Sequence, residues 1–120
     1  MRILIYLEQS KILEKMISQY QVNPGVGGTT YTSARLGIEL QKESNDNNLN
    51  FQITLFTKNP RKDNFFDLKV IDEKEAFKNE WDIVLLTGNV IEKIYTTKIK
   101  LNSKRTFIWS RHPFDKNMVR

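Results

Sequence analysis

Cysteine is absent from this chain of 120 residues, and histidine occurs only once. Without cysteine the chain can form no disulfide, no thiolate-ligated zinc site and no thiol nucleophile, a composition compatible with a reducing cytoplasm. One histidine cannot build a His-Glu-x-x-His zinc site, and no Gly-x-Ser-x-Gly elbow marks a serine hydrolase. The sequence therefore predicts a cytoplasmic protein with no metal site.

Long apolar runs are also missing, since no stretch approaches the roughly 20 residues that a membrane-spanning helix needs. Residues 1–7 resemble a strand and carry no small-residue cleavage site, so we expect no secretory signal. Hydrophobic residues make up 39% of the chain and charged residues 28%, which is enough apolar material for a core. This length and composition predict one small domain over residues 1–120.

Five short runs of apolar, β-branched and aromatic residues predict five strands. They span residues 2–7, 51–57, 68–71, 81–87 and 105–110. The first run is almost continuously apolar, as expected of a strand buried on both faces of a parallel sheet. Helical patterns lie between most of the runs. This alternation predicts an α/β fold with a Rossmann-like, doubly wound parallel sheet in the strand order 3-2-1-4-5.

Helices are predicted from apolar spacing and from capping residues. In residues 29–43 the small Gly37 would let a helix approach the sheet closely. Residues 72–75 read Asp-Glu-Lys-Glu, a capping box at the start of a short helix, and residues 89–92 repeat the device. An amphipathic helix of about three turns is expected in residues 10–20.

Two polar or incomplete regions lie outside this pattern. Residues 43–50 are polar and rich in asparagine, which predicts a surface loop. Residues 115–120 begin like a helix after the fifth strand, and the sequence then ends. A doubly wound sheet normally covers its last strand with a helix. The chain is therefore expected to be part of a larger domain, or to need a partner that covers its exposed face.

The glycine-rich segment Asn-Pro-Gly-Val-Gly-Gly-Thr-Thr, residues 23–30, is the strongest functional signal. Gly25, Gly27 and Gly28 directly precede a helix that starts near Thr29. Helix N-termini present unpaired N–H groups, and glycine lets a phosphate or sugar approach the backbone. The spacing is neither Gly-x-Gly-x-x-Gly nor a P-loop. A tight turn leading into a helix is the structural alternative.

A second candidate site follows the fifth strand, at Trp-Ser-Arg-His-Pro-Phe-Asp, residues 109–115. Ligands of open α/β sheets bind at the carboxyl ends of the strands. His112 could donate to a sugar hydroxyl or move a proton, and Arg111 could pair with a phosphate. A loop histidine with no such role, and an Arg111 neutralised by Asp115, are the alternatives.

The succession of these features resembles the start of a glycosyltransferase. The features are an N-terminal strand, the Pro-Gly-x-Gly-Gly-Thr segment at 24–29, a helix with Leu36, Gly37 and Leu40, and a Phe-x-Ile-Thr-Leu-Phe-Thr strand at 51–57. It is similar to the N-terminal, acceptor-side domain of the GT-B-fold retaining nucleotide-sugar transferases, the group that includes glycogen and sucrose synthases. The resemblance is most specific in residues 24–40.

That resemblance implies a function and a set of site residues. It implies transfer of a sugar from a nucleotide donor to a hydroxyl of an acceptor glycan or small molecule, with no cofactor besides the donor substrate. Gly27, Gly28 and Thr29 would face the cleft near the donor phosphates, and His112 would lie near the donor sugar. The donor itself would be held by a second domain or partner chain, so the isolated chain is expected to be inactive.

Charge supplies a competing hypothesis. The net charge is +5, but residues 91–120 carry +6 and residues 1–90 carry −1. A basic segment can meet a nucleotide, a nucleic acid or a lipid surface, and peripheral membrane contact is compatible with it. The aromatic residues lie in the strand runs rather than among the lysines, so we expect no specific nucleic-acid binding. A non-catalytic Rossmann-type binding module and a polyanion binder remain the alternatives to the transferase.

Overall fold

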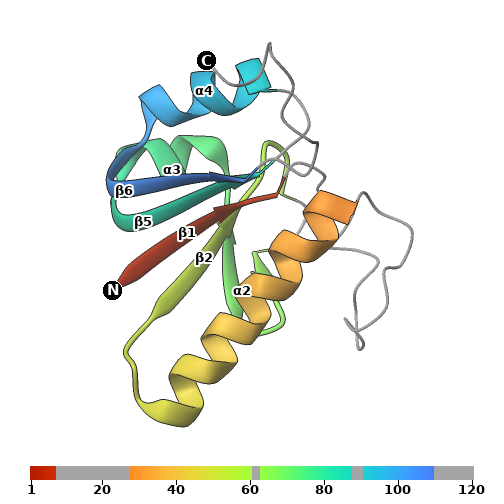
Figure 1. The fold of residues 1–120 in the computed structure, drawn as a ribbon, viewed down its shortest axis with the longest axis vertical. Coiled ribbons are helices and arrows are strands. Elements are labelled where there is room, and N and C mark those ends of the chain that lie inside the picture. Colours follow the sequence, from red (N-terminus) through yellow and green to blue (C-terminus); the bar gives the residue numbers. More distant parts are fainter. Residues whose placement is uncertain (8–27, 61–62, 88–90, 110–120) are drawn as a thin grey trace.

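A mostly parallel, six-stranded β-sheet with helices on both faces forms the structure, a computed structural model that describes residues 1–7, 28–60, 63–87 and 91–109 (Figure 1). The elements in chain order are β1 (Arg2–Tyr6), α2 (Gly28–Asn47), β2 (Gln52–Phe56), β3 (Asn64–Phe65), β4 (Leu68–Ile71), α3 (Glu73–Lys78), β5 (Glu80–Thr87), α4 (Ile91–Lys100) and β6 (Asn102–Trp109). The predicted α/β class is therefore confirmed.

The strand order across the sheet is β3-β4-β2-β1-β5-β6. The predicted count of five and the order 3-2-1-4-5 need correction, because β3 adds a short strand at one edge, antiparallel to β4. Two residues are too few to leave a periodic signal in the sequence. The other five strands pair in parallel, and β1 lies at the centre between β2 and β5.

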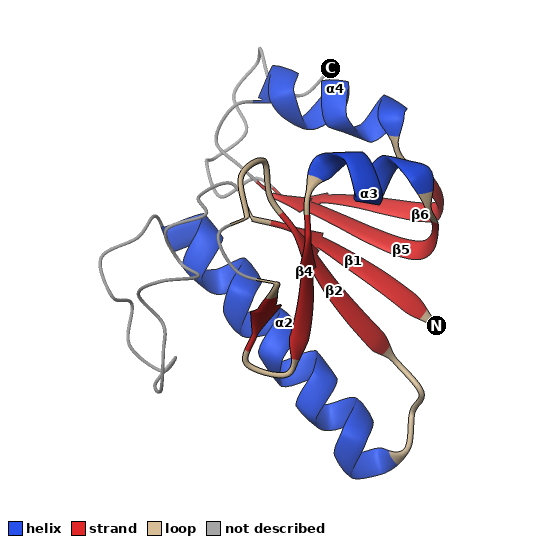
Figure 2. Ribbon diagram, turned by 180° about the vertical axis from the view of Figure 1, so that it is seen from behind, coloured by secondary structure: helices blue, strands red, loops and turns tan. Residues whose placement is uncertain are grey.

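Alternate residues of the strands feed two separate cores, one on each face of the sheet. In β1, Ile3 and Ile5 belong to the core that packs under α2, whereas Leu4 belongs to the core on the opposite face, which includes Ala76 of α3. Helices α3 and α4 lie on that opposite face (Figures 1 and 2). Right-handed crossovers explain why the helices lie on both faces of the sheet. The connection from β1 to β2 runs in one direction along the sheet, and the connections from β4 to β5 and from β5 to β6 run in the opposite direction.

Helix α2 approaches the sheet closely at Gly37, as predicted. A Cβ atom at that position would lie 3.2 Å from Leu55 Cδ2 and 3.2 Å from Leu68 Cδ1, tighter than an ordinary van der Waals contact. A larger residue would require the Leu55 and Leu68 side chains to shift by a few tenths of an ångström. The glycine therefore allows α2 to pack closely on β2 and β4 with these leucines in place.

The prediction of a loop over residues 43–50 is wrong for its first half, because α2 continues to Asn47. Its end is a Schellman-type cap, in which Asn48 has a left-handed φ of 54° and the Leu49 N–H donates to the Ser44 carbonyl at 3.0 Å. The buried Ser44 hydroxyl also accepts the N–H of Phe51 at 2.7 Å. The asparagines that suggest a loop are thus solvent-facing helix residues and a helix cap.

The predicted capping box of the short third helix is confirmed in its N-cap half. Asp72 is the N-cap residue of α3, and its Oδ1 accepts the N–H of Glu75 at 2.9 Å. The strand predicted at 105–110 begins earlier, at Asn102, because Asn102 and Ser103 pair with Glu80 and Trp81 of β5. The predicted helices at 10–20 and 115–120, and the start of the second capping box at 89, lie outside the described residues.

Candidate functional site

The structure describes two of the six residues predicted for the site. Gly28 and Thr29 are the first two residues of α2. Gly25, Gly27, Arg111 and His112 lie outside the described residues, so the prediction that the glycine segment and His112 share one edge of the sheet stays a prediction. Strand β6 ends at Trp109, two residues before Arg111.

The carboxyl edge of the sheet is where α2 begins and where all five parallel strands end. Connections from β1 and from β5 leave in opposite directions, since β1 leads to β2 on one side and β5 leads to β6 on the other. Such a reversal point is where open α/β sheets bind their ligands. Gly28 and Thr29 therefore belong to the element that borders this point.

Buried hydroxyl groups join the elements at this edge. The Ser33 Oγ of α2 and the Thr87 Oγ1 of β5 are hydrogen-bonded at 2.7 Å, and both residues are fully buried. The Thr87 hydroxyl also donates to the carbonyl of Tyr6, the last residue of β1, at 3.4 Å. One hydroxyl pair thus fixes the start of α2 against the ends of the two central strands.

Two further buried threonines lie at the same edge. Thr30 belongs to the first turn of α2, and Thr57 directly follows β2. No buried side-chain nitrogen or oxygen among the described residues lacks a hydrogen-bond partner. The interior at the carboxyl edge is therefore polar, and the hydrogen-bonding capacity of its described buried side chains is satisfied within the protein.

These buried hydroxyl residues were not predicted from the sequence, although two of them, Thr57 and Thr87, leave a recognisable pattern in it. Thr57 and Thr87 each close an apolar strand run, in Gln-Ile-Thr-Leu-Phe-Thr and Asp-Ile-Val-Leu-Leu-Thr. A polar residue at the carboxyl end of a buried strand is a position from which α/β proteins build sites. Ser33 gives no such signal, because its burial depends on how α2 packs.

Charge at the start of α2 favours an anion. The first turn of α2 contains no acidic residue, so no side-chain carboxylate there neutralises the positive end of the helix dipole. The first backbone N–H groups of a helix have no partner within the helix, and Gly28 carries no side chain to shield them. The helix dipole would therefore stabilise a negative charge placed at this position.

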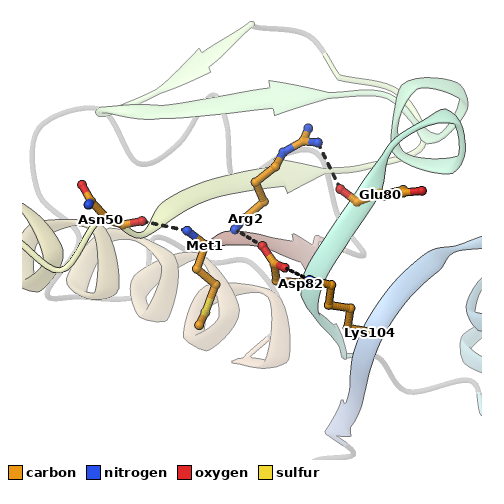
Figure 3. Close-up of polar contacts among 6 residues, drawn as sticks. All are labelled: Met1, Arg2, Asn50, Glu80, Asp82 and Lys104. Carbon is orange, nitrogen blue, oxygen red and sulfur yellow. Dashed lines mark hydrogen bonds and ion pairs between the residues drawn. The ribbon is translucent and has the colours of Figure 1, made fainter.

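The amino edge of the sheet has a different construction, built from exposed charges (Figure 3). The backbone N–H of Arg2 donates to Asp82 Oδ2 at 2.8 Å, and Lys104 Nζ lies 3.2 Å from Asp82 Oδ1. These two contacts, the Arg2 N–H before Lys104, lower the pKa of the Asp82 carboxyl below its ordinary value. The Arg2 guanidinium donates to the Glu80 carbonyl at 3.0 Å. The cluster joins β1, β5 and β6.

Other classes of site receive no support from the described residues. Among them no three acidic or histidine side chains come close enough together to hold a metal ion. None of the described helices is both long and apolar enough to cross a membrane. The described lysines of the basic region are spread over α4 and β6, where Lys104 already pairs with Asp82.

Comparison with known proteins assigns no family to this chain. Compared with protein-family models, with curated proteins and with solved structures, the chain matches none of them.

Proposed function

We propose that this chain is the acceptor-side half of a glycosyltransferase that moves a sugar from a nucleotide donor to an acceptor hydroxyl. One observation carries the proposal: α2 begins with Gly28 and Thr29 at the carboxyl edge of the sheet, beside the ends of β1 and β5 where the chain direction reverses. That position combines the N–H groups of a helix amino end, which have no partner within the helix, with the usual ligand edge of the fold. The resemblance of residues 24–40 to nucleotide-sugar transferases supplies the reaction class.

The reaction needs charge stabilisation more than covalent chemistry from this half. The bond between the sugar and the diphosphate breaks, a bond from the sugar to the acceptor oxygen forms, and the proton of the acceptor hydroxyl passes to the leaving diphosphate or to water. Negative charge grows on the leaving diphosphate. The amino end of α2 would stabilise this charge, and Arg111 and His112, two and three residues after the end of β6, would orient the phosphate and the sugar.

The chain by itself is expected to be catalytically silent. A second domain or partner chain would hold most of the donor, and without it water is not excluded and the donor is not positioned. We expect binding of nucleotide sugars to the isolated chain to be weak, on the order of millimolar, because only a few contacts are available. Turnover assays alone therefore cannot test the proposal.

The test is an NMR titration of the isolated chain with a panel of nucleotide sugars, free nucleoside diphosphates and oligosaccharides. Amide shifts should change at residues 28–30, 57 and 87, on the carboxyl edge, and not at Arg2, Asp82 or Lys104 on the amino edge. Thr29→Val keeps the size of the side chain but removes its hydroxyl, and should weaken the response at least threefold. Thr96→Val on α4 is the matched control and should leave it unchanged.

Three outcomes would contradict the proposal in different ways. Shifts confined to the amino edge would remove the site. Equal responses to every polyanion, lost as salt is raised, would favour electrostatic binding through the basic region. Robust sugar transfer or donor hydrolysis by the isolated chain, abolished in His112→Ala, would show a complete enzyme rather than half of one.

A further inference from the structure

A small polar pocket opens at the amino edge of the sheet, on the face that carries α3. Its volume is about 160 Å³. Ile71 and Trp81 line it and belong to the core on that face. Its polar lining consists of Arg2 of β1, Gln52 and Thr54 of β2, Lys69 of β4, Glu75 of α3, and Asn79. The pocket is separate from the candidate site at the start of α2, which lies at the carboxyl edge.

Strand pairing places two cationic residues on either side of β2. Arg2 of β1 is the register partner of Gln52, and Lys69 of β4 is the register partner of Thr54. Residues 52 and 54 share one face of the sheet, because side chains alternate along a strand. Neighbouring strands lie about 4.8 Å apart, so the backbones of β1 and β4 are roughly 10 Å apart. A ligand over β2 would therefore lie between the two cationic residues.

Thr54 brings to this pocket a hydroxyl group that no other described residue uses. The residue is only 6% exposed, and its hydroxyl forms no hydrogen bond with another described residue. Every fully enclosed polar side-chain atom of the described residues has a partner, so the Thr54 oxygen is reached from the pocket. A hydroxyl in this position can donate to a ligand or accept from one.

Opposite charges line the pocket without neutralising each other. Lys69 and Glu75 are both exposed, and neither forms an ion pair with another described residue. The Arg2 guanidinium donates to the Glu80 carbonyl at 3.0 Å (Figure 3). Its Cζ also lies 4.4 Å from the centroid of the Trp81 ring. These contacts hold the guanidinium in place and use one of its five N–H donors, so the others remain for a ligand.

We propose that this pocket binds a small zwitterion, a free amino acid. The carboxylate of the ligand lies between Arg2 and Lys69 and accepts the hydrogen of the Thr54 hydroxyl. Its ammonium group lies at Glu75 and at the side-chain oxygen of Asn79. The Asn79 Nδ2 already donates to the Glu75 carbonyl at 2.7 Å, which leaves Oδ1 as an acceptor. Each charged side chain that lines the pocket then has a partner of opposite sign.

Size and charge favour an amino acid over a simple anion. A cavity of about 150 Å³ can hold benzene, and alanine has as many non-hydrogen atoms as benzene. A phosphate group would also meet the two cationic side chains, but it would leave the Glu75 carboxylate facing a like charge. An ammonium group removes that repulsion. The proposal does not depend on the transferase function, because the two sites lie at opposite edges of the sheet.

The test is an NMR titration of the whole chain with alanine and with two analogues that each lack one charge. Propionate lacks the ammonium group, and ethylamine lacks the carboxylate. The side-chain amide signals of Gln52 and Asn79 report on the pocket. Alanine should bind at least about fivefold more tightly than either analogue, because it alone makes both sets of charged contacts. Inorganic phosphate is the fourth probe and should bind more weakly than alanine.

Variants separate the two ends of the ligand. Lys69→Met should weaken alanine binding about fivefold without weakening ethylamine binding, and Glu75→Gln should weaken alanine binding without weakening propionate binding. Lys74→Met is the matched control, because Lys74 is an exposed lysine of α3 that does not line the pocket. Thr54→Val should weaken alanine binding about threefold without lowering the free energy of unfolding, because the hydroxyl has no described protein partner to lose.

Several results would overturn the proposal. They are no saturable binding of alanine, tighter binding of phosphate than of alanine, and equal losses of affinity in Lys69→Met and Lys74→Met. Destabilisation by Thr54→Val with unchanged alanine binding would give the hydroxyl a structural role and also contradict the proposal. Tighter binding of γ-aminobutyrate than of alanine would support the zwitterion and show that its two charges are further apart. None of these results bears on binding at the carboxyl edge.

Discussion

The two edges of the sheet are held together by different chemistry. At the carboxyl edge, the buried hydroxyls of Ser33 and Thr87 join α2 to β5 and reach the end of β1. At the amino edge, Asp82 receives the Arg2 N–H and pairs with Lys104, whose side chain is 82% exposed. The hydroxyl pair is closed to water, and the ion pair is open to it.

The difference shows which edge can tolerate change and which can form a site. Exposed ion pairs contribute little to stability because water and salt screen them. A buried hydrogen bond contributes more, since its loss leaves a polar group without a partner. The Ser33–Thr87 pair therefore holds the second turn of α2 against β5 more firmly than Lys104 holds β6 at the other edge.

The largest effect is expected from the buried hydroxyl pair. Ser33→Ala and Thr87→Val should each lower the free energy of unfolding by about 1–2 kcal/mol, because each removes the hydrogen bond between two buried hydroxyls. The double variant should cost about 1 kcal/mol less than the sum of the single ones. Urea denaturation of the four proteins measures this, and strict additivity would contradict a direct interaction.

A second hydroxyl pair provides the matched control for that cycle. Ser103 and Thr106 of β6 are hydrogen-bonded at 2.5 Å, but both residues are only half-buried. Water can replace the lost partner there, so Ser103→Ala and Thr106→Val should cost about 0.5 kcal/mol or less. Equal losses for the two pairs would show that burial does not distinguish them.

The cap of α3 should have an intermediate effect. Asp72 follows β4 at the carboxyl edge and accepts the N–H of Glu75. Asp72→Ala should cost about 1 kcal/mol of stability, whereas Asp72→Asn keeps an accepting oxygen and should cost only a few tenths. Thermal unfolding of the two variants measures the difference. If both variants lost the same stability, the cap would not be the cause.

The amino edge should show a small effect that depends on pH. The pKa of Asp82 is lowered in the folded protein from its ordinary value of 3.8. The ionised carboxylate therefore stabilises the fold above that value, and the contribution disappears as the pH falls through the lowered pKa. The stability difference between wild type and Asp82→Asn should be constant near neutral pH and shrink below about pH 4. A difference that grew on acidification would contradict this sign.

The smallest effect is expected at Lys104. Lys104→Met removes the ammonium group but leaves the Arg2 N–H on the Asp82 carboxylate. The hydrogen bond from the Arg2 N–H is the larger cause of the lowered pKa. An NMR titration of Lys104→Met should therefore still find the pKa of Asp82 lowered, though less than in wild type. High salt should reproduce most of the change in the wild-type protein. Complete loss of the shift in Lys104→Met would assign it to the ion pair instead.

Much of the fold could be predicted because it depends on local patterns. The apolar runs at β1, β2, β4 and β5 are β-branched or aromatic and bounded by turn residues, and Asp72 and Glu75 have capping-box spacing. The short β3 could not be predicted, since two residues carry no period. Nor could the start of β6, because Asn102 and Ser103 become strand residues only by pairing with β5.

The candidate site, like the fold, could be predicted only in part from the sequence. The sequence by itself determined that glycines precede α2 and that the strands alternate with helices, because backbone freedom and apolar periodicity are local properties. Only the tertiary structure decided that Ser33 and Thr87, 54 positions apart, form one buried pair. It also decided that Leu85 of β5 and Phe107 of β6 lie side by side, because that depends on how the strands pair rather than on either strand's own sequence.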